Sequence, residues 1–156
     1  MLDLKKHPRI EWSLQEITAS PLPNLETLRL DNKTLENFHL LAILSPSLEK
    51  HCLRSLDLCS CLGLKFHSLD WLEKHGQNLV ELRITGNTTV TDETLKEVMK
   101  FKKLRYLNLW GCTISCTGLM QVVNGSQGKL REVVFGKGFW WEHLIANEFG
   151  VFTPVD

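Results

Sequence analysis

A recurring leucine pattern constrains this chain more than any other feature of its sequence. Four segments have the form Leu-x-x-Leu-x-Leu or its near equivalent, and a fifth keeps the same apolar spacing. Their first leucines are Leu25, Leu53, Leu79, Leu104 and Leu130, so successive segments are separated by 28, 26, 25 and 26 residues. A period this regular over five segments indicates an internal structural repeat.

The first residues of the chain fit a further, incomplete unit. Leu2 and Leu4 lie 26 residues before Leu28 and Leu30. The sequence therefore predicts about six units, with the chain starting inside the strand of the first. A bare end of a repeat array exposes apolar surface and strand edges. We therefore expect the chain to be a fragment or isoform of a longer protein, the alternative being a partner that covers this end.

Each unit has the same internal order of strand, turn and helix. The Leu-x-Leu part alternates with the period of two expected of a strand with one buried face. Eight residues after the first leucine, the three middle units have Cys61, Asn87 and Cys112, which can bond to the backbone where it leaves the strand. Helical spacing follows, with Thr91 and Ser115 as predicted N-caps. Such units cannot bury their apolar faces alone, so we expect them to stack into a curved solenoid.

The repeat resembles that of leucine-rich repeat proteins, and in particular their cysteine-containing subtype. In that subtype the leucine strand is followed by Cys or Asn, then by an Ile-Thr-Asp-like helix start and an apolar helix. The closest match is LVELRITGNTTVTDETLKEV at residues 79–98, followed by LRYLNLWGCTISCTGLMQVV at residues 104–123. The resemblance implies an α/β leucine-rich repeat solenoid (horseshoe), with a parallel sheet on the concave side and helices on the convex side.

The repeats and the C-terminal segment divide the sequence into two parts. We assign residues 1–138 to leucine-rich repeats and residues 139–156 to a C-terminal capping helix and tail. Residues 139–149 have helix-like apolar spacing that includes Trp140 and Trp141. A repeat array needs a terminal cap with a polar outer face. Capping is one interpretation of this segment, and binding of a partner is the other.

The residues between the leucines are expected on the open, concave face of the sheet. Residues at equivalent positions form a central column whose first four members alternate between acid and base. The column consists of Asp3, Arg29, Asp57, Arg83, Asn108 and Val134. These charges either satisfy one another on a solvated sheet or recognise a charged peptide or domain.

Tyr106 and Trp110 belong to one unit and are expected to flank Asn108 on the same face. Large aromatic side chains beside a polar centre are typical of a binding hot spot. The alternative is that the segment after Phe135 folds back and covers them. The predicted protein-binding residues are Arg29, Asp57, Arg83, Tyr106, Asn108, Trp110, Trp140 and Trp141.

Composition argues against several other functions. Lys plus Arg and Asp plus Glu each number 18, and the resulting zero formal charge argues against a nucleic-acid surface or a polybasic membrane anchor. No apolar run approaches the roughly 20 residues needed to span a bilayer. The charged segment 1–12 does not resemble a secretory signal. We therefore expect a cytoplasmic or nuclear protein with neither nucleic acid nor membrane as a partner.

The cysteines and glycines do not form a recognisable metal or catalytic motif. The five cysteines are expected to be reduced thiols, because no signal segment directs the chain to an oxidising compartment. Cys59 and Cys61 have one residue between them, which is too tight for a zinc finger. Gly136-Lys137-Gly138 is too short for a phosphate-binding loop. The sequence therefore predicts no metal, no cofactor and no enzymatic activity.

The function that the resemblance implies is protein–protein interaction. The cysteine-containing subtype is frequent in substrate-recognition subunits of F-box ubiquitin ligases and in related stand-alone mitotic regulators. It therefore implies substrate recognition for a cullin-RING type ubiquitin ligase. Because no F-box-like segment precedes the repeats, we expect a ligase adaptor or cullin to be reached through a part not in this chain. The alternative is a stand-alone regulator or scaffold that binds a signalling or cell-cycle protein without a ligase role.

Overall fold

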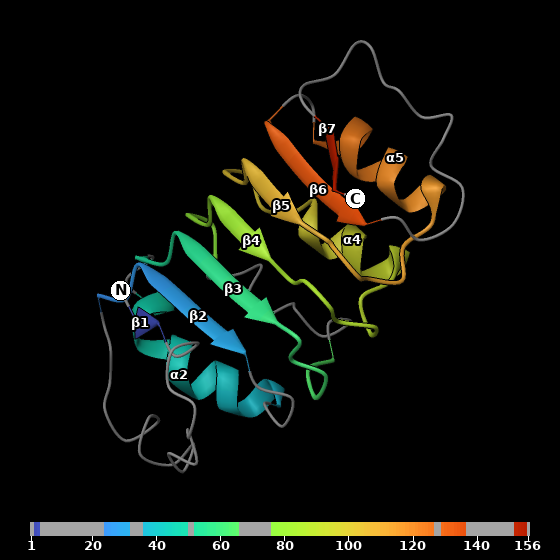
Figure 1. Ribbon diagram of the computed structural model, residues 1–156. Coiled ribbons are helices and arrows are strands. Elements are labelled where there is room, and N and C mark those ends of the chain that lie inside the picture. Colours follow the sequence, from blue (N-terminus) through green and yellow to red (C-terminus); the bar gives the residue numbers. More distant parts are fainter. Residues whose placement is uncertain are drawn as a thin grey trace.

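Seven parallel strands form one sheet in a computed structural model that describes residues 2–3, 24–31, 36–49, 52–65, 76–126, 129–136 and 152–155. The strands follow chain order and are β1 (Leu2–Asp3), β2 (Thr27–Asp31), β3 (Ser55–Cys59), β4 (Glu81–Arg83), β5 (Tyr106–Asn108), β6 (Glu132–Gly136) and β7 (Phe152–Val155). The described helices are α2 (Asn37–Glu49), α4 (Asp92–Val98) and α5 (Cys116–Gly125). Figure 1 shows these helices on one side of the sheet. The architecture is α/β with a parallel sheet, as the sequence predicts.

Equivalent residues of successive units lie side by side in the sheet. The second apolar position of each unit forms one continuous row: Leu28, Leu56, Leu82, Leu107 and Val133. The four leucines of this row are at most 1% exposed. Burying one leucine side chain contributes about 1.5–3 kcal/mol relative to leaving it exposed, so this row is a main source of stability. Leu2 pairs with Leu28, which confirms the predicted first strand.

The side chains predicted to bond to the backbone after the strands do so. Asn87 Nδ2 donates to the carbonyls of Leu58 and Ile84, both at 2.7 Å. In the units on either side, the thiols of Cys61 and Cys112 donate to the carbonyl equivalent to that of Leu58, at 3.8 and 3.1 Å. One side chain per unit therefore links the end of its strand to the strand before it.

The residue before each of these side chains has a left-handed backbone. The φ angle is 51° at Ser60 and 70° at both Gly86 and Gly111. Glycine adopts this conformation without steric penalty, whereas another residue is disfavoured by about 1–2 kcal/mol. A Cβ atom at Gly111 would lie 3.3 Å from Gly86 Cα, so these turns also stack closely.

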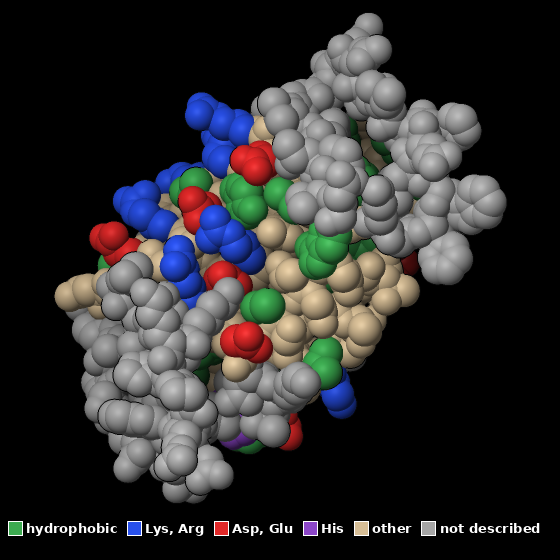
Figure 2. Space-filling view, in the orientation of Figure 1, with side chains coloured by type: hydrophobic (Ala, Val, Ile, Leu, Met, Phe, Trp, Pro, Cys, Tyr) green, Lys and Arg blue, Asp and Glu red, His purple; other side chains and the backbone are tan. Residues whose placement is uncertain are grey.

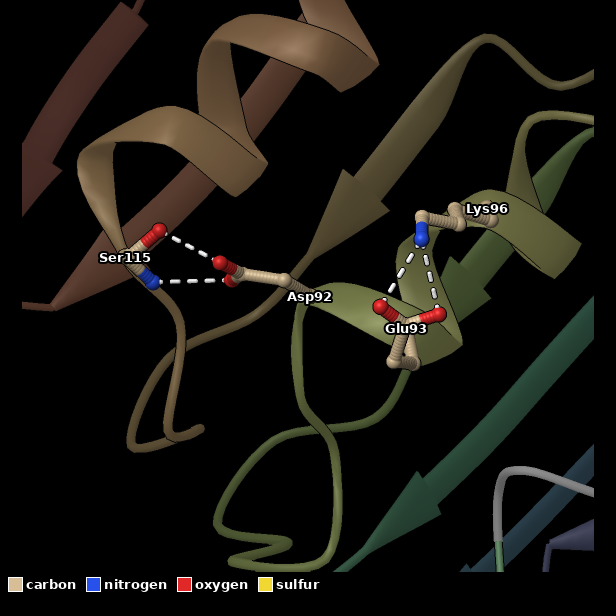
Figure 3. Close-up of polar contacts among 4 residues, drawn as sticks. All are labelled: Asp92, Glu93, Lys96 and Ser115. Atoms are coloured by element: carbon tan, nitrogen blue, oxygen red, sulfur yellow. Dashed lines mark hydrogen bonds and ion pairs between the residues drawn. The ribbon is translucent and has the colours of Figure 1, made fainter.

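Helices α4 and α5 begin at the predicted caps and are joined by one carboxylate. The Thr91 N–H donates to Thr94 Oγ1 at 3.2 Å, and Ser115 Oγ accepts from the Gly118 N–H at 3.1 Å. The Asp92 carboxylate accepts hydrogen bonds from the hydroxyl of Ser115 and, at 2.9 Å, from its backbone N–H (Figure 3). Its negative charge also lies at the positive N-terminal end of α5.

Strand β7 was not predicted from the sequence. It pairs in parallel with β6, from Val133 with Phe152 to Gly136 with Val155. It falls within residues 139–156, assigned from sequence to a capping helix and tail. The segment lacks the leucine pattern and contains a proline, which hides its strand character. The helix expected over residues 139–149 lies outside the described residues.

Candidate protein-interaction surface

The strand pairing brings the predicted surface residues into neighbouring rows. The central row runs in pairing order through Asp3, Arg29, Asp57, Arg83, Asn108 and Val134. The row beside it runs through Thr27, Ser55, Glu81, Tyr106 and Glu132. Figure 2 views this face and shows acidic and basic groups next to one another over the middle of the sheet. The central row has the register predicted from the sequence.

Asp57 is the buried acid of the central row. It is only 5% exposed and pairs in register with Arg29 on one side and Arg83 on the other. A buried carboxylate is stable only with opposite charges or hydrogen bonds around it. Asp57 is therefore part of the support of this face, and its neighbours Arg29 and Arg83 are more accessible at the surface.

Arg83 is held by groups on three neighbouring strands. Its guanidinium forms an ion pair with Glu81 at 3.2 Å and lies 4.6 Å from the centroid of the Tyr106 ring. Glu81 also accepts a hydrogen bond from Ser55 Oγ at 3.1 Å. Burial lowers the pKa of Arg83 and is the largest single effect, but the Tyr106 hydrogen bond and the charges of Glu81 and Asp57 raise this pKa above its ordinary value. The surface thus carries a fixed cation stacked on an aromatic ring.

Tyr106, Asn108 and Trp110 lie together, as the sequence predicts. Asn108 Nδ2 donates to the Tyr106 hydroxyl at 3.4 Å, and Asn108 Oδ1 accepts from the Trp110 N–H at 3.0 Å. The Trp110 ring covers Gly136 of the next strand, where a Cβ atom would lie 3.0 Å from the ring. Both aromatic side chains are half-buried. We call Arg83, Tyr106, Asn108 and Trp110 the aromatic cluster.

The other predicted site residues differ in where they lie. Arg29 is half-buried on β2, in the same row as Arg83 but two strands away. Trp140 and Trp141 lie outside the described residues. Glu81 and Ser55 contribute to the site although they were not among the predicted binding residues. Their position beside Arg83 in the adjacent row was the signal that could have identified them.

Among the described residues, no group of three or more His, Cys, Asp or Glu side chains is arranged to hold a metal ion. All five cysteines are described, and none forms a disulfide. A cavity of about 50 Å³ lies between the C-terminal ends of α4 and α5 and is lined by residues that include Met99, Leu104 and Val122. It shares no lining residue with the aromatic cluster.

None of the helices within the described ranges is long and apolar enough to cross a membrane. Comparison with protein families finds no family model that matches this chain, and comparison with curated proteins finds no match either. The geometry of the surface and the pattern of the repeat are therefore the features that bear on function.

Proposed function

We propose that this chain is a non-enzymatic protein-interaction module of the leucine-rich repeat type, in its cysteine-containing subtype. We also propose that the repeats form a horseshoe and that the face of the sheet opposite the helices is its concave recognition surface. Two observations support it. Equivalent residues pair in register from β1 to β6, and Cys61, Asn87 and Cys112 repeat the same bond to the preceding strand.

The aromatic cluster is the observation that carries the proposed function. Tyrosine, tryptophan and arginine are the residues most enriched at the energetic centres of protein interfaces. Here they are half-buried, and they are held by one another through the stacked cation and the Asn108 hydrogen bonds. Side chains held in place before binding lose less conformational entropy in a complex. The cluster is therefore suited to a protein partner.

The role we propose for the module is substrate recognition for a cullin-RING type ubiquitin ligase. It rests on the resemblance of the repeat at residues 79–98 and 104–123 to ligase substrate receptors. The adaptor or cullin would be reached through a part outside this chain, and the module would work without a cofactor in the cytoplasm or nucleus. The second candidate is a stand-alone regulator that uses the same surface to bind a signalling or cell-cycle protein.

Quantitative affinity capture from cells tests the surface. The chain is compared with a Tyr106→Ala, Trp110→Ala variant and with a Phe38→Ala, Leu41→Ala control. The control removes two exposed apolar side chains from α2 instead. We expect one protein to be captured by the chain and the control and to be depleted at least about tenfold with the cluster variant, a loss of about 1.4 kcal/mol. Equal capture by all three folded proteins would contradict the proposed site.

The same experiment separates the two candidate roles. A cullin or adaptor captured together with the partner, and accumulation of that partner when cullin activation is inhibited, would support ligase function. A stoichiometric partner whose level does not respond to that inhibition would support the stand-alone regulator.

A further inference from the structure

The edge of the sheet where β3, β5 and β6 begin is strongly basic, although the chain as a whole has zero formal charge. Six cationic residues lie just before β3, β5 and β6: Arg54, Lys102, Lys103, Arg105, Lys129 and Arg131. We call them the basic rim. Five are exposed, and Arg105 is half-buried. Figure 2 shows basic side chains gathered along the edge from which the strands start in Figure 1.

Backbone hydrogen bonds fix the spacing of the rim. The N–H of Arg131 donates to the carbonyl of Arg105 at 2.8 Å, and the N–H of Arg105 donates to that of Val80 at 2.9 Å. The N–H of Val80 in turn donates to the carbonyl of Arg54 at 2.7 Å. Arg54 and Arg131 are therefore three strand steps apart, about 14 Å at the usual strand spacing.

A second row of the rim runs parallel to the first. Lys103 and Lys129 each precede the first leucine of their unit, as Arg105 and Arg131 each follow it. Two lysines and two arginines thus occupy equivalent positions in adjacent units. The Lys103 ammonium donates to Asn78 Oδ1 at 2.5 Å, which confirms that this row also follows the unit order.

Within the described ranges, no carboxylate forms an ion pair with the rim. The ion pairs seen there join Arg83 to Glu81, Lys96 to Glu93 and Lys100 to Glu97, all outside the rim. Clustered cations repel one another, and this repulsion is relieved when an anion binds.

The extent of the rim and its neighbours indicate what kind of anion fits. A length of about 14 Å spans about four residues of an extended peptide. The zero formal charge of the chain disfavours a nucleic-acid partner, because such surfaces usually need an overall basic excess. Glu132 lies in the next row of the sheet and would repel a phosphate backbone that passes over it. A protein segment can place neutral or basic residues there.

We propose that the basic rim binds a short acidic segment of a protein partner. This inference goes beyond the proposed function, because it assigns the charge of a bound segment and requires neither a ligase nor the aromatic cluster. The rim borders the row that contains Glu81 and Tyr106. One partner can therefore contact both the basic rim and the aromatic cluster.

Fluorescence polarisation with a labelled peptide that carries a central run of glutamates tests the proposal. We expect saturable binding at about 50 mM salt that weakens as salt is raised, because exposed charges are then screened. Arg105→Gln with Arg131→Gln should weaken binding at least about fivefold. Lys65→Gln with Lys96→Gln removes the same charge elsewhere and should leave affinity within about twofold. Thermal unfolding of both double variants shows whether each is folded.

Three results would overturn the proposal. They are unchanged affinity in the folded rim variant, equal loss in the charge-matched control, and tighter binding of an oligothymidylate of the same length than of the peptide. The Tyr106→Ala, Trp110→Ala variant separates this proposal from the proposed function. If only the proposed function fails, peptide binding still depends on the rim; if only the rim proposal fails, cellular capture still depends on the cluster.

Discussion

The edge of the sheet where the strands end and the edge where they begin are built from the same repeat but differ in burial, charge and bonding. At the first edge, Cys61 and Asn87 are fully buried, uncharged and bonded to backbone carbonyls. At the second edge, Arg54 and Arg131 are exposed and form no ion pair with a described carboxylate. Where the strands end, the need to bond backbone carbonyls restricts the residue type. Where they begin, no such need applies, so the side chains there are free to serve a function.

Removing the buried donor should have the largest effect on stability. Asn87→Ala leaves the Leu58 and Ile84 carbonyls without their side-chain donor and leaves a small cavity. We expect the free energy of unfolding, measured by urea denaturation, to fall by about 2–4 kcal/mol. Asn87→Cys keeps a donor, as the neighbouring units do, and should lose less than half as much. A loss below about 0.5 kcal/mol for Asn87→Ala would show that this bond is not structural.

The thiol at the same edge predicts a dependence of stability on pH. Burial raises the pKa of Cys112 to about 11, whereas a thiol in an unfolded chain has a pKa of about 8.5. Between pH 8.5 and 11 the unfolded state therefore binds fewer protons than the folded state. The contribution of the Cys112 thiol to stability is complete below about pH 8.5 and is lost as the pH rises toward 11.

Cys112→Ser keeps a hydroxyl donor for the Ile84 carbonyl but does not titrate in this range. Between pH 8 and 10, the free energy of unfolding of the parent chain should fall by about 2 kcal/mol more than that of this variant. Parallel pH profiles for the two proteins would contradict the raised pKa.

Backbone conformation at the strand ends should have a smaller effect on stability, and this effect should differ between equivalent positions. Gly111 has a positive φ, which disfavours alanine, and a Cβ atom there would also lie against Gly86. Gly111→Ala should therefore lower the free energy of unfolding by about 1–2 kcal/mol. Ser60→Gly relieves a non-glycine residue from the same conformation and should leave stability unchanged or raise it. Thermal unfolding of both variants measures the difference. A loss in Ser60→Gly as large as that in Gly111→Ala would contradict this account.

Substitution at the basic edge should have the smallest effect on folding. Arg105→Gln with Arg131→Gln removes two rim cations that have no ion-pair partner among the described carboxylates. We expect the free energy of unfolding to stay within about 0.5 kcal/mol of the parent value. A loss comparable with that of Asn87→Ala would mean that both edges are structural.

The leucine period was sufficient to predict the central part of the fold. It determined the register of β1 to β6, because a slip by one residue would turn every buried leucine toward solvent. It also placed Asn87 and its equivalents at the strand ends, and Thr91 and Ser115 at the starts of helices. Each of these residues satisfies a local backbone requirement, which is why the sequence alone reveals it.

Features that depend on contacts between distant residues were missed. Strand β7 has no leucine pattern, and its pairing with β6 depends on the return of the chain rather than on local sequence. The basic rim is divided in the sequence into a single residue before β3, a triplet before β5 and a pair before β6, and acids elsewhere cancel it in the total charge. The burial of Asp57 likewise arises from its neighbours on both sides.

The bond between Asp92 and Ser115 bears on how such arrays change by duplication and exchange of units. The start of α5 is completed by a carboxylate that belongs to the previous helix, 23 residues earlier in the chain. A unit transplanted without its predecessor would lose part of its own helix cap. The smallest exchangeable module is therefore a pair of adjacent units, so grafting experiments should move α4 and α5 together.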